Sequence, residues 1–205
     1  MSRRRKVYDE SNVPKNSIRK LALKAGAKRM GGMVYEELRG VMKVYIGILL
    51  TNTITFTEYG KRKTIQVKDI EGALAQMGKA YGGYDKKGCG TYETHIQKQR
   101  GGKGKSQKYK PGTVTLKSIN YYQKNSACLA IAKAVFSRLI RRELQYMSDD
   151  VRQVSEEAMI VLQFVTEAYM IDMLKDAVLV AIGQKNQTLL PRHIQTARRI
   201  RGERA

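Results

Sequence analysis

The sequence predicts an all-α protein made of two similar helical domains. Three observations lead to this class: an internal repeat, a long amphipathic pattern in each half, and a strongly basic composition with an apolar fraction of 42%. That fraction is sufficient for a folded core, and 205 residues accommodate two compact domains of about 100 residues each.

The repeat has an offset of 124 residues, the distance in sequence from Lys61 to Lys185. Residues 61–73 and 185–197 both read K-x-x-T-[IL]-x-x-[KR]-x-I-x-x-A. The same offset aligns apolar positions upstream, pairing Val34 with Ala158, Leu38 with Leu162, Val41 with Val165, Tyr45 with Tyr169, Leu49 with Met173 and Ile54 with Val178. A fixed offset of this kind indicates two copies of one structural unit.

The spacing of these apolar positions predicts one long helix per half, over residues 33–59 and 155–184. Each helix would have roughly 27 to 30 residues and be about 40 to 45 Å long. Shorter helices are predicted before the long ones, at 17–25 and 132–146, and after them, at 67–76 and 191–200. The plan is therefore short, long, short, twice, with one further helix expected at 117–124.

Glycine, lysine and polar stretches divide the chain. We predict a basic N-terminal arm at 1–13, a first domain at 14–84, a Gly/Lys-rich linker at 85–107, and a second domain with the extra helix at 108–205.

The charge balance points to a polyanionic partner. Lys and Arg number 39 against 18 Asp and Glu, which gives a formal net charge of +21. Nucleic acid is the default partner, although ribosomal and membrane-surface proteins share this balance. No run of about 18 apolar residues and no signal-peptide core are evident, so we expect a soluble, non-secreted protein without membrane partners.

The cysteines give no metal-site or redox motif. Cys89 and Cys128 are the only two, and neither belongs to a CxxC pair. A reducing compartment is favoured, while a disulfide between them stays open.

Several segments resemble histones. The sequences I-R-K-L-A at 18–22, A-K-R at 27–29, V-Y-E-E-L-R-G-V at 34–41 and T-E-Y-G-K-R-K-T at 57–64 resemble histone four. The sequences K-P-G-T-V at 110–114, Y-Q-K at 122–124, E-A-Y at 167–169 and A-R-R-I-R-G-E-R-A at 197–205 resemble histone three. The likeness covers 14–84 and 108–205, and a fusion in this order looks like the doublets of some large DNA viruses.

The resemblance implies two histone folds of short-long-short helices, paired within one chain as a handshake heterodimer. Fusion would raise the effective concentration of the partner domain to roughly the millimolar range. The implied function is structural: wrapping double-stranded DNA into nucleosome-like particles. Histone octamers are the reference case of such sequence-independent binding through phosphates and inserted minor-groove arginines.

Candidate DNA contacts follow from the handshake, which brings the loop before one long helix beside the loop after the other. One paired-loop site would combine Arg29 with Lys185 and Thr188, and the other Arg152 with Lys61, Lys63 and Thr64. By resemblance the two arginines enter the groove, and a threonine hydroxyl can brace each guanidinium. Further candidates are Lys28 beside Arg29; Arg19, Lys20, Lys24, Arg138 and Arg141 at a central site; and Lys110, Pro111, Gly112, Thr113 and Lys117, matching a histone-three segment that touches DNA near the ends of its wrap.

Each of these residues has an alternative interpretation as a solvated surface charge. The chain also departs from the family: Leu23 stands at a basic position of histone four, and Ala75 and Gln76 replace a Lys and Arg pair. Fewer phosphate contacts are expected as a result.

Two protein partners are implied. Residues 168–200 resemble the surface through which two histone-three copies associate, and the last helix of the first domain with 81–84 resembles the surface that docks a histone two B/two A-like doublet. Asn186 and His193 stand where the family has Arg and Asp, and Gly183 where it has His, so self-association is expected in altered form. His193 is assigned no chemistry.

The nucleus or a viral DNA compartment (host nucleus, viral factory or virion) is the expected location. We predict no catalytic residue, metal or cofactor. His95 lies in the linker, no Ser or Cys nucleophile stands beside a plausible base, and the acids Glu36, Glu37, Glu156 and Glu157 suit helix N-termini. The alternative function is a histone-fold subunit of a transcription or assembly complex, which would need base-edge readers. A single-strand stacking platform at 81–92 is the remaining alternative to a plain linker.

Overall fold

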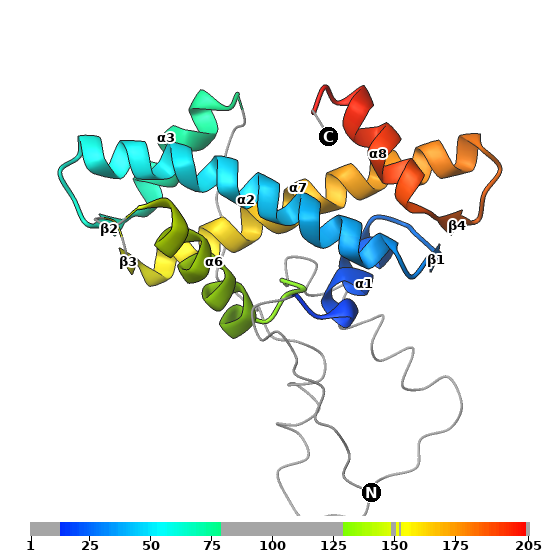
Figure 1. Ribbon diagram of the computed structural model, residues 1–205, viewed down its shortest axis with the longest axis horizontal. Helices are drawn as coiled ribbons and strands as arrows, with labels where there is room; N and C mark the ends of the chain where they lie inside the picture. Colours follow the sequence, from blue (N-terminus) through cyan, green and yellow to red (C-terminus); the bar gives the residue numbers. More distant parts are fainter. Residues whose placement is uncertain (1–12, 79–128, 149–150, 152, 204–205) are drawn as a thin grey trace, which may run out of the picture. The chain divides into compact units, whose positions relative to one another are not determined.

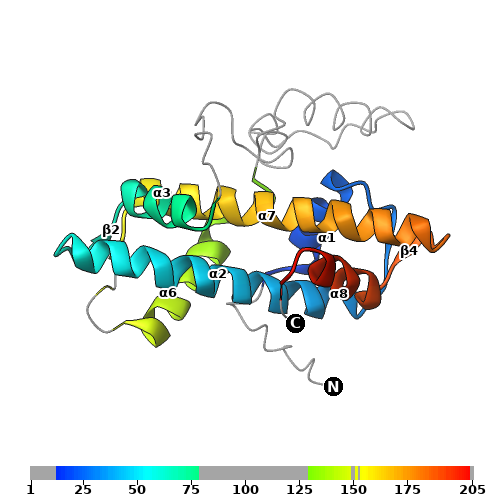
Figure 2. The ribbon, with the colours of Figure 1, turned by 90° about the horizontal axis from the view of Figure 1, so that it is seen from above.

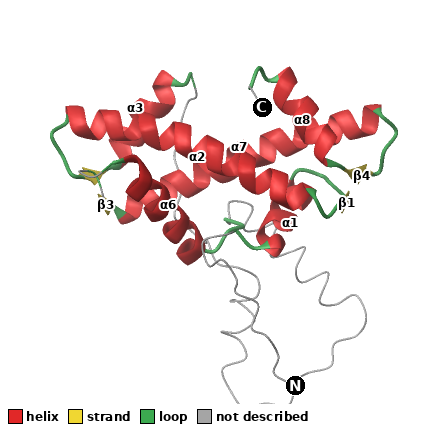
Figure 3. Ribbon diagram, in the orientation of Figure 1, coloured by secondary structure: helices red, strands yellow, loops and turns green. Residues whose placement is uncertain are grey.

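The computed structural model describes residues 13–78, 129–148, 151 and 153–203. These residues form α1 (Lys15–Lys24), β1 (Arg29–Met30), α2 (Val34–Tyr59), β2 (Thr64–Ile65), α3 (Val67–Gln76), α6 (Lys133–Met147), β3 (Gln153–Val154), α7 (Glu156–Gly183), β4 (Thr188–Leu189) and α8 (Pro191–Ile200). The prediction of a helical chain is confirmed, with each of these six helices beginning and ending within two residues of its predicted bounds (Figure 3). The helix predicted at 117–124 and both cysteines lie outside the described residues.

The two long helices cross, and the short helices of each half pack on both of them (Figures 1 and 2). From the first half, α1 and α3 contact α7 as well as α2; from the second, α6 and α8 contact α2 as well as α7. All ten elements lie in one compact unit. Neither half therefore buries its apolar side chains without the other.

The aromatic pair Tyr45 and Tyr169 marks the centre of this crossing. Their rings stack with centroids 3.8 Å apart and an interplanar angle of 3°. Because the two residues are related by the 124-residue repeat, their contact indicates an approximate two-fold axis between the halves. Burial raises the pKa of Tyr45 to about 12, and burial together with a 2.6 Å hydrogen bond to Glu203 raises the pKa of Tyr169.

By length and composition, α2 is the one helix among the described residues that could cross a membrane. Half of its most apolar stretch is buried inside the protein, however, and Leu38, Ile46 and Leu50 are almost fully enclosed. Since these side chains pack against other helices of the same unit, α2 is a core helix.

Candidate nucleic-acid interface

Two short parallel strand pairs lie at opposite ends of the crossed helices (Figure 1). At one end β1 pairs with β4, which sets Arg29 opposite Thr188 and Met30 opposite Leu189. At the other end β2 pairs with β3, which sets Thr64 opposite Gln153. The structure thus brings together the loops that the repeat and the family resemblance paired.

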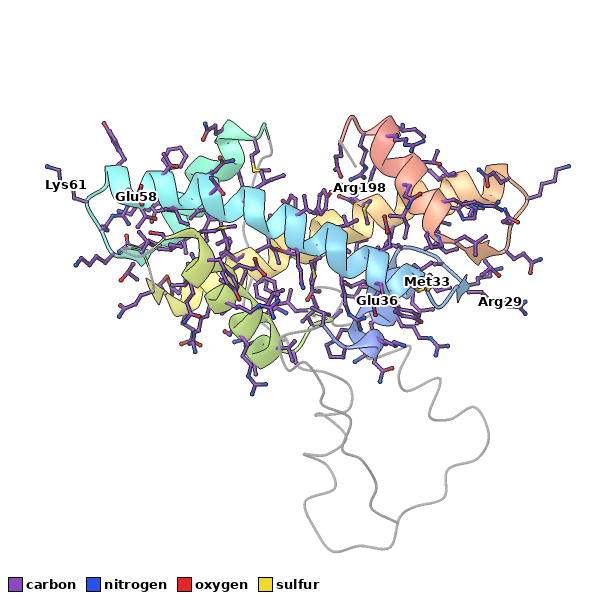
Figure 4. All side chains as sticks on the ribbon, viewed as in Figure 1. Arg29, Met33, Glu36, Glu58, Lys61 and Arg198 are labelled. Atoms are coloured by element: carbon purple, nitrogen blue, oxygen red, sulfur yellow. The ribbon has the colours of Figure 1, made fainter. Side chains whose placement is uncertain are left out.

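The β1·β4 end carries exposed cations. Lys28, Arg29 and Lys185 are all exposed, and Figure 4 shows the Arg29 side chain directed outward. Within the described part of the chain, no side-chain hydrogen bond joins Thr188 to Arg29. The predicted bracing of the arginine is therefore not formed in the free protein, although the register keeps the two residues opposite each other.

The β2·β3 end has a similar character. Lys61 and Lys63 are exposed, and Thr64 donates a 3.3 Å hydrogen bond from its hydroxyl to Gln153 Oε1. Arg152, the predicted groove arginine of this end, lies outside the described residues. Arg62, between the two lysines, instead pairs with the carboxylate of Asp69. Asp69 is a buried residue, with 3% of its surface exposed.

Lys61 and Lys185 share an uncommon backbone conformation. Their φ angles are 51° and 57°, and they are the non-glycine residues with positive φ in the described ranges. Each follows a long helix and donates its N–H back to it, Lys61 to Glu58 O at 2.8 Å and Lys185 to Ile182 O at 2.8 Å.

Glycine is the usual residue at such a helix end, and this chain uses it after α1, at Gly26, and after α8, at Gly202. A side chain in the left-handed region costs roughly 1–2 kcal/mol. Strain of this kind is often kept where function requires a particular side chain. The repeated lysine therefore favours a role for its charge at both ends.

Several carboxylates pair with arginines that were not predicted to bind DNA. These pairs include Arg39 with Glu36, Arg62 with Asp69, Arg198 with Glu203 and Arg201 with Asp176. In contrast, no carboxylate of the described residues forms a salt bridge with the loop cations Arg29, Lys61, Lys63 and Lys185. Their positive field is thus left available to a polyanion.

The predicted central-site residues lie on α1 and α6, which occupy the same side of the crossed long helices (Figure 1). Arg19 and Lys24 are exposed and Lys20 is half-buried on α1, while Arg138 and Arg141 are exposed on α6. Lys110, Pro111, Gly112, Thr113 and Lys117 lie outside the described residues, as do 81–84 and His95.

Sequence reasoning missed one pair of cations. Arg192 lies in the first turn of α8, directly after β4, and its repeat equivalent Lys68 lies in the first turn of α3, directly after β2. Both occupy the [KR] position of the repeated motif, so the motif already contained the signal. They extend the basic surface at each end.

Among the described residues, no group of three or more His, Cys, Asp or Glu side chains could hold a metal ion. Glu36 and Glu37 lie in the first turn of α2, and Glu156 and Glu157 in the first turn of α7. Acids at these positions interact favourably with the helix dipole, which accounts for them structurally.

Comparison with protein families gives one match. Residues 111–200 match the family model of the core histone domain, which covers histones two A, two B, three and four. The matched segment contains α6, α7 and α8 with β3 and β4. It supports a histone fold and, in general terms, the DNA-associated, non-enzymatic structural role of that family.

Proposed function

We propose that the chain is a core histone doublet that wraps double-stranded DNA without reading its sequence. The observation that supports this most directly is the pair of parallel loop contacts, because exposed cations gather at each end of one helical unit. The family match over 111–200 supports the same role.

The two halves act as the two partners of a handshake heterodimer, the first resembling histone four and the second histone three. This proposal is supported by the packing of α1 and α3 on α7, and of α6 and α8 on α2. It is also supported by the stacking of the repeat equivalents Tyr45 and Tyr169. One fused chain then replaces a pair of separate subunits, with domains at 14–84 and 108–205.

In the proposed complex, Arg29 enters the minor groove at the β1·β4 end, and Arg152 does so at the other. Lys61, Lys63 and Lys185 neutralise adjacent phosphates, while the cations of α1 and α6 contact the backbone between the two ends. Contacts of this kind depend on charge and on groove width, so any duplex that bends serves as substrate.

Two protein partners complete the particle. A second copy would associate through 168–200, where Leu179, Ile182 and Ile200 are exposed apolar side chains. A histone two B/two A-like doublet would dock on α3 and 81–84. A nucleus or a viral DNA compartment is the proposed location.

A salt titration of binding to two unrelated duplexes tests the function. Packaging predicts near-equal affinities and a steep salt dependence, with a slope of about −0.9 for each neutralised phosphate. A strong preference for one sequence would instead support a subunit of a transcription or assembly complex.

Nuclease digestion tests the assembly. Alone, the protein is expected to protect about half of the roughly 147 base pairs of a full octamer, and the second doublet should complete the protection. Full-length protection by this chain alone would refute the need for a second doublet.

A further inference from the structure

The last short helices, α3 and α8, begin with the same capping arrangement but different chemistry. In the first half, Asp69 accepts a hydrogen bond from Gln66 N at 2.9 Å and also pairs with Arg62. The repeat offset places His193 and Asn186 at the positions of Asp69 and Arg62. The charged Arg62–Asp69 pair of the first half is therefore replaced in the second half by Asn186 and His193, of which the histidine can titrate.

His193 is fully enclosed, with 0% of its surface exposed. Its Nδ1 accepts a 3.2 Å hydrogen bond from Leu190 N, and its Nε2 lies 3.1 Å from Gln184 Oε1 and 3.5 Å from Asn186 Nδ2. Since Nδ1 is the acceptor, the neutral ring carries its proton on Nε2 and donates it to Gln184. A second proton must bind Nδ1, where it removes the acceptor of the Leu190 N–H.

The surroundings oppose that second proton. Burial lowers the pKa of His193, and the charge of Arg192 lowers it further. The helices packed on α8 carry further charged groups, among them Glu36, Glu37, Arg39 and Lys43 on α2, and Asp172, Lys175 and Asp176 on α7, where Asp176 pairs with Arg201. The helix α8 itself adds Arg198 and Arg199, and Lys185 lies in the loop before β4. No carboxylate among the described residues hydrogen-bonds the ring, and the positive end of the α8 dipole also disfavours an imidazolium.

The helices on either side of this cap, α7 and α8, carry three exposed apolar side chains, here called the apolar patch, and the first half has polar residues at the equivalent positions. Leu179, Ile182 and Ile200 are 66%, 63% and 74% exposed. Their repeat equivalents are the polar residues Thr55, Glu58 and Gln76. Apolar contacts through these side chains would let two chains of net charge +21 associate without depending on their like charges.

We propose that His193 makes self-association through this patch sensitive to acid, because protonation at Nδ1 opens the first turn of α8, the helix that carries Ile200. The proposal rests on the association of two copies put forward above. Because the pKa of His193 is lower in the folded protein than its ordinary value of 6.5, the cap is intact above that pH. Its contribution is lost as the pH falls through the folded-state pKa.

Sedimentation of the full-length chain at pH 7.5 and pH 5.5 tests the proposal. The dissociation constant of the self-associated form should be higher at pH 5.5 than at pH 7.5, because protonation of His193 opens the first turn of α8. His193→Gln keeps a capping acceptor without titrating, so its association should be independent of pH. The double variant His193→Asp with Asn186→Arg, which copies the first half's pair, should behave in the same way.

His95, the other histidine of the chain, provides the matched control, and His95→Gln should retain the full pH dependence. Association of the unaltered protein that does not change with pH would overturn the acid sensitivity while leaving self-association standing. Absence of association at both pH values would overturn self-association itself. Loss of pH dependence in His95→Gln would overturn the assignment to His193.

Discussion

Replacing Lys61 or Lys185 by glycine should stabilise the protein and weaken its binding to DNA. Both lysines adopt positive φ at the end of a long helix. Glycine relieves roughly 1–2 kcal/mol of left-handed strain. Its greater freedom in the unfolded chain costs roughly 0.5–1 kcal/mol. Taken at the middle of both ranges, the net gain is about 0.75 kcal/mol for each site, or about 1.5–3 °C in Tm for a chain of this size.

The DNA effect has the opposite sign, because each substitution removes one exposed cation. The slope of log affinity against log salt should become shallower by about 0.9 for each lost phosphate contact, equally on unrelated duplexes. Lys61→Arg is the matched control: it keeps both the charge and the strain, so neither stability nor slope should change appreciably.

Urea unfolding of the free protein and salt titration of DNA binding measure the two effects independently. Unchanged affinity and slope in both glycine variants would show that these lysines are solvated surface charges that do not contact DNA. A loss of stability on substitution by glycine would show that the left-handed conformation is not strained in the native protein.

Other expected outcomes follow from the same structure. Ser155→Ala removes the side chain that accepts from Ala158 N and should lower the free energy of unfolding by about 1 kcal/mol in urea titrations. Leu49→Ala should cost about 2–5 kcal/mol, and calorimetry should still show one transition because both halves share the core; two separated transitions would contradict this. Arg29→Ala should leave unfolding within about 0.5 kcal/mol of the native value while reducing the salt slope by about one; an unchanged slope would remove Arg29 from the interface.

The helices were predictable because local and global signals agree. The apolar spacing defines one buried face for α2, and Pro191 and the acids of the first turns mark helix starts. The repeat also predicted contacts between residues far apart in the sequence. If the two halves pair symmetrically, the loop before each long helix lies beside the loop after the other long helix. The register of Arg29 opposite Thr188 followed from that symmetry and the family resemblance.

Side-chain environments were less predictable. No sequence signal separates Arg62, which forms a salt bridge, from its exposed neighbours Lys61 and Lys63. Arg62 differs from them only because the folded loop brings it close to Asp69 on α3. The burial of His193 likewise depends on how α8 packs on α7. The bracing of Arg29 by Thr188 is absent from the free protein for a related reason: backbone register places two residues opposite each other without fixing their rotamers.

The central claim is that both ends of one chain hold the same DNA molecule. It is tested most directly by attaching a DNA-cleaving reagent at Thr64→Cys or Thr188→Cys, in a chain whose native Cys89 and Cys128 are replaced. The account predicts cuts in the minor groove from each position, separated by about two helical turns because the α1 and α6 cations occupy the inward-facing groove between them. Cuts from only one end, or cuts scattered without a fixed separation, would contradict it.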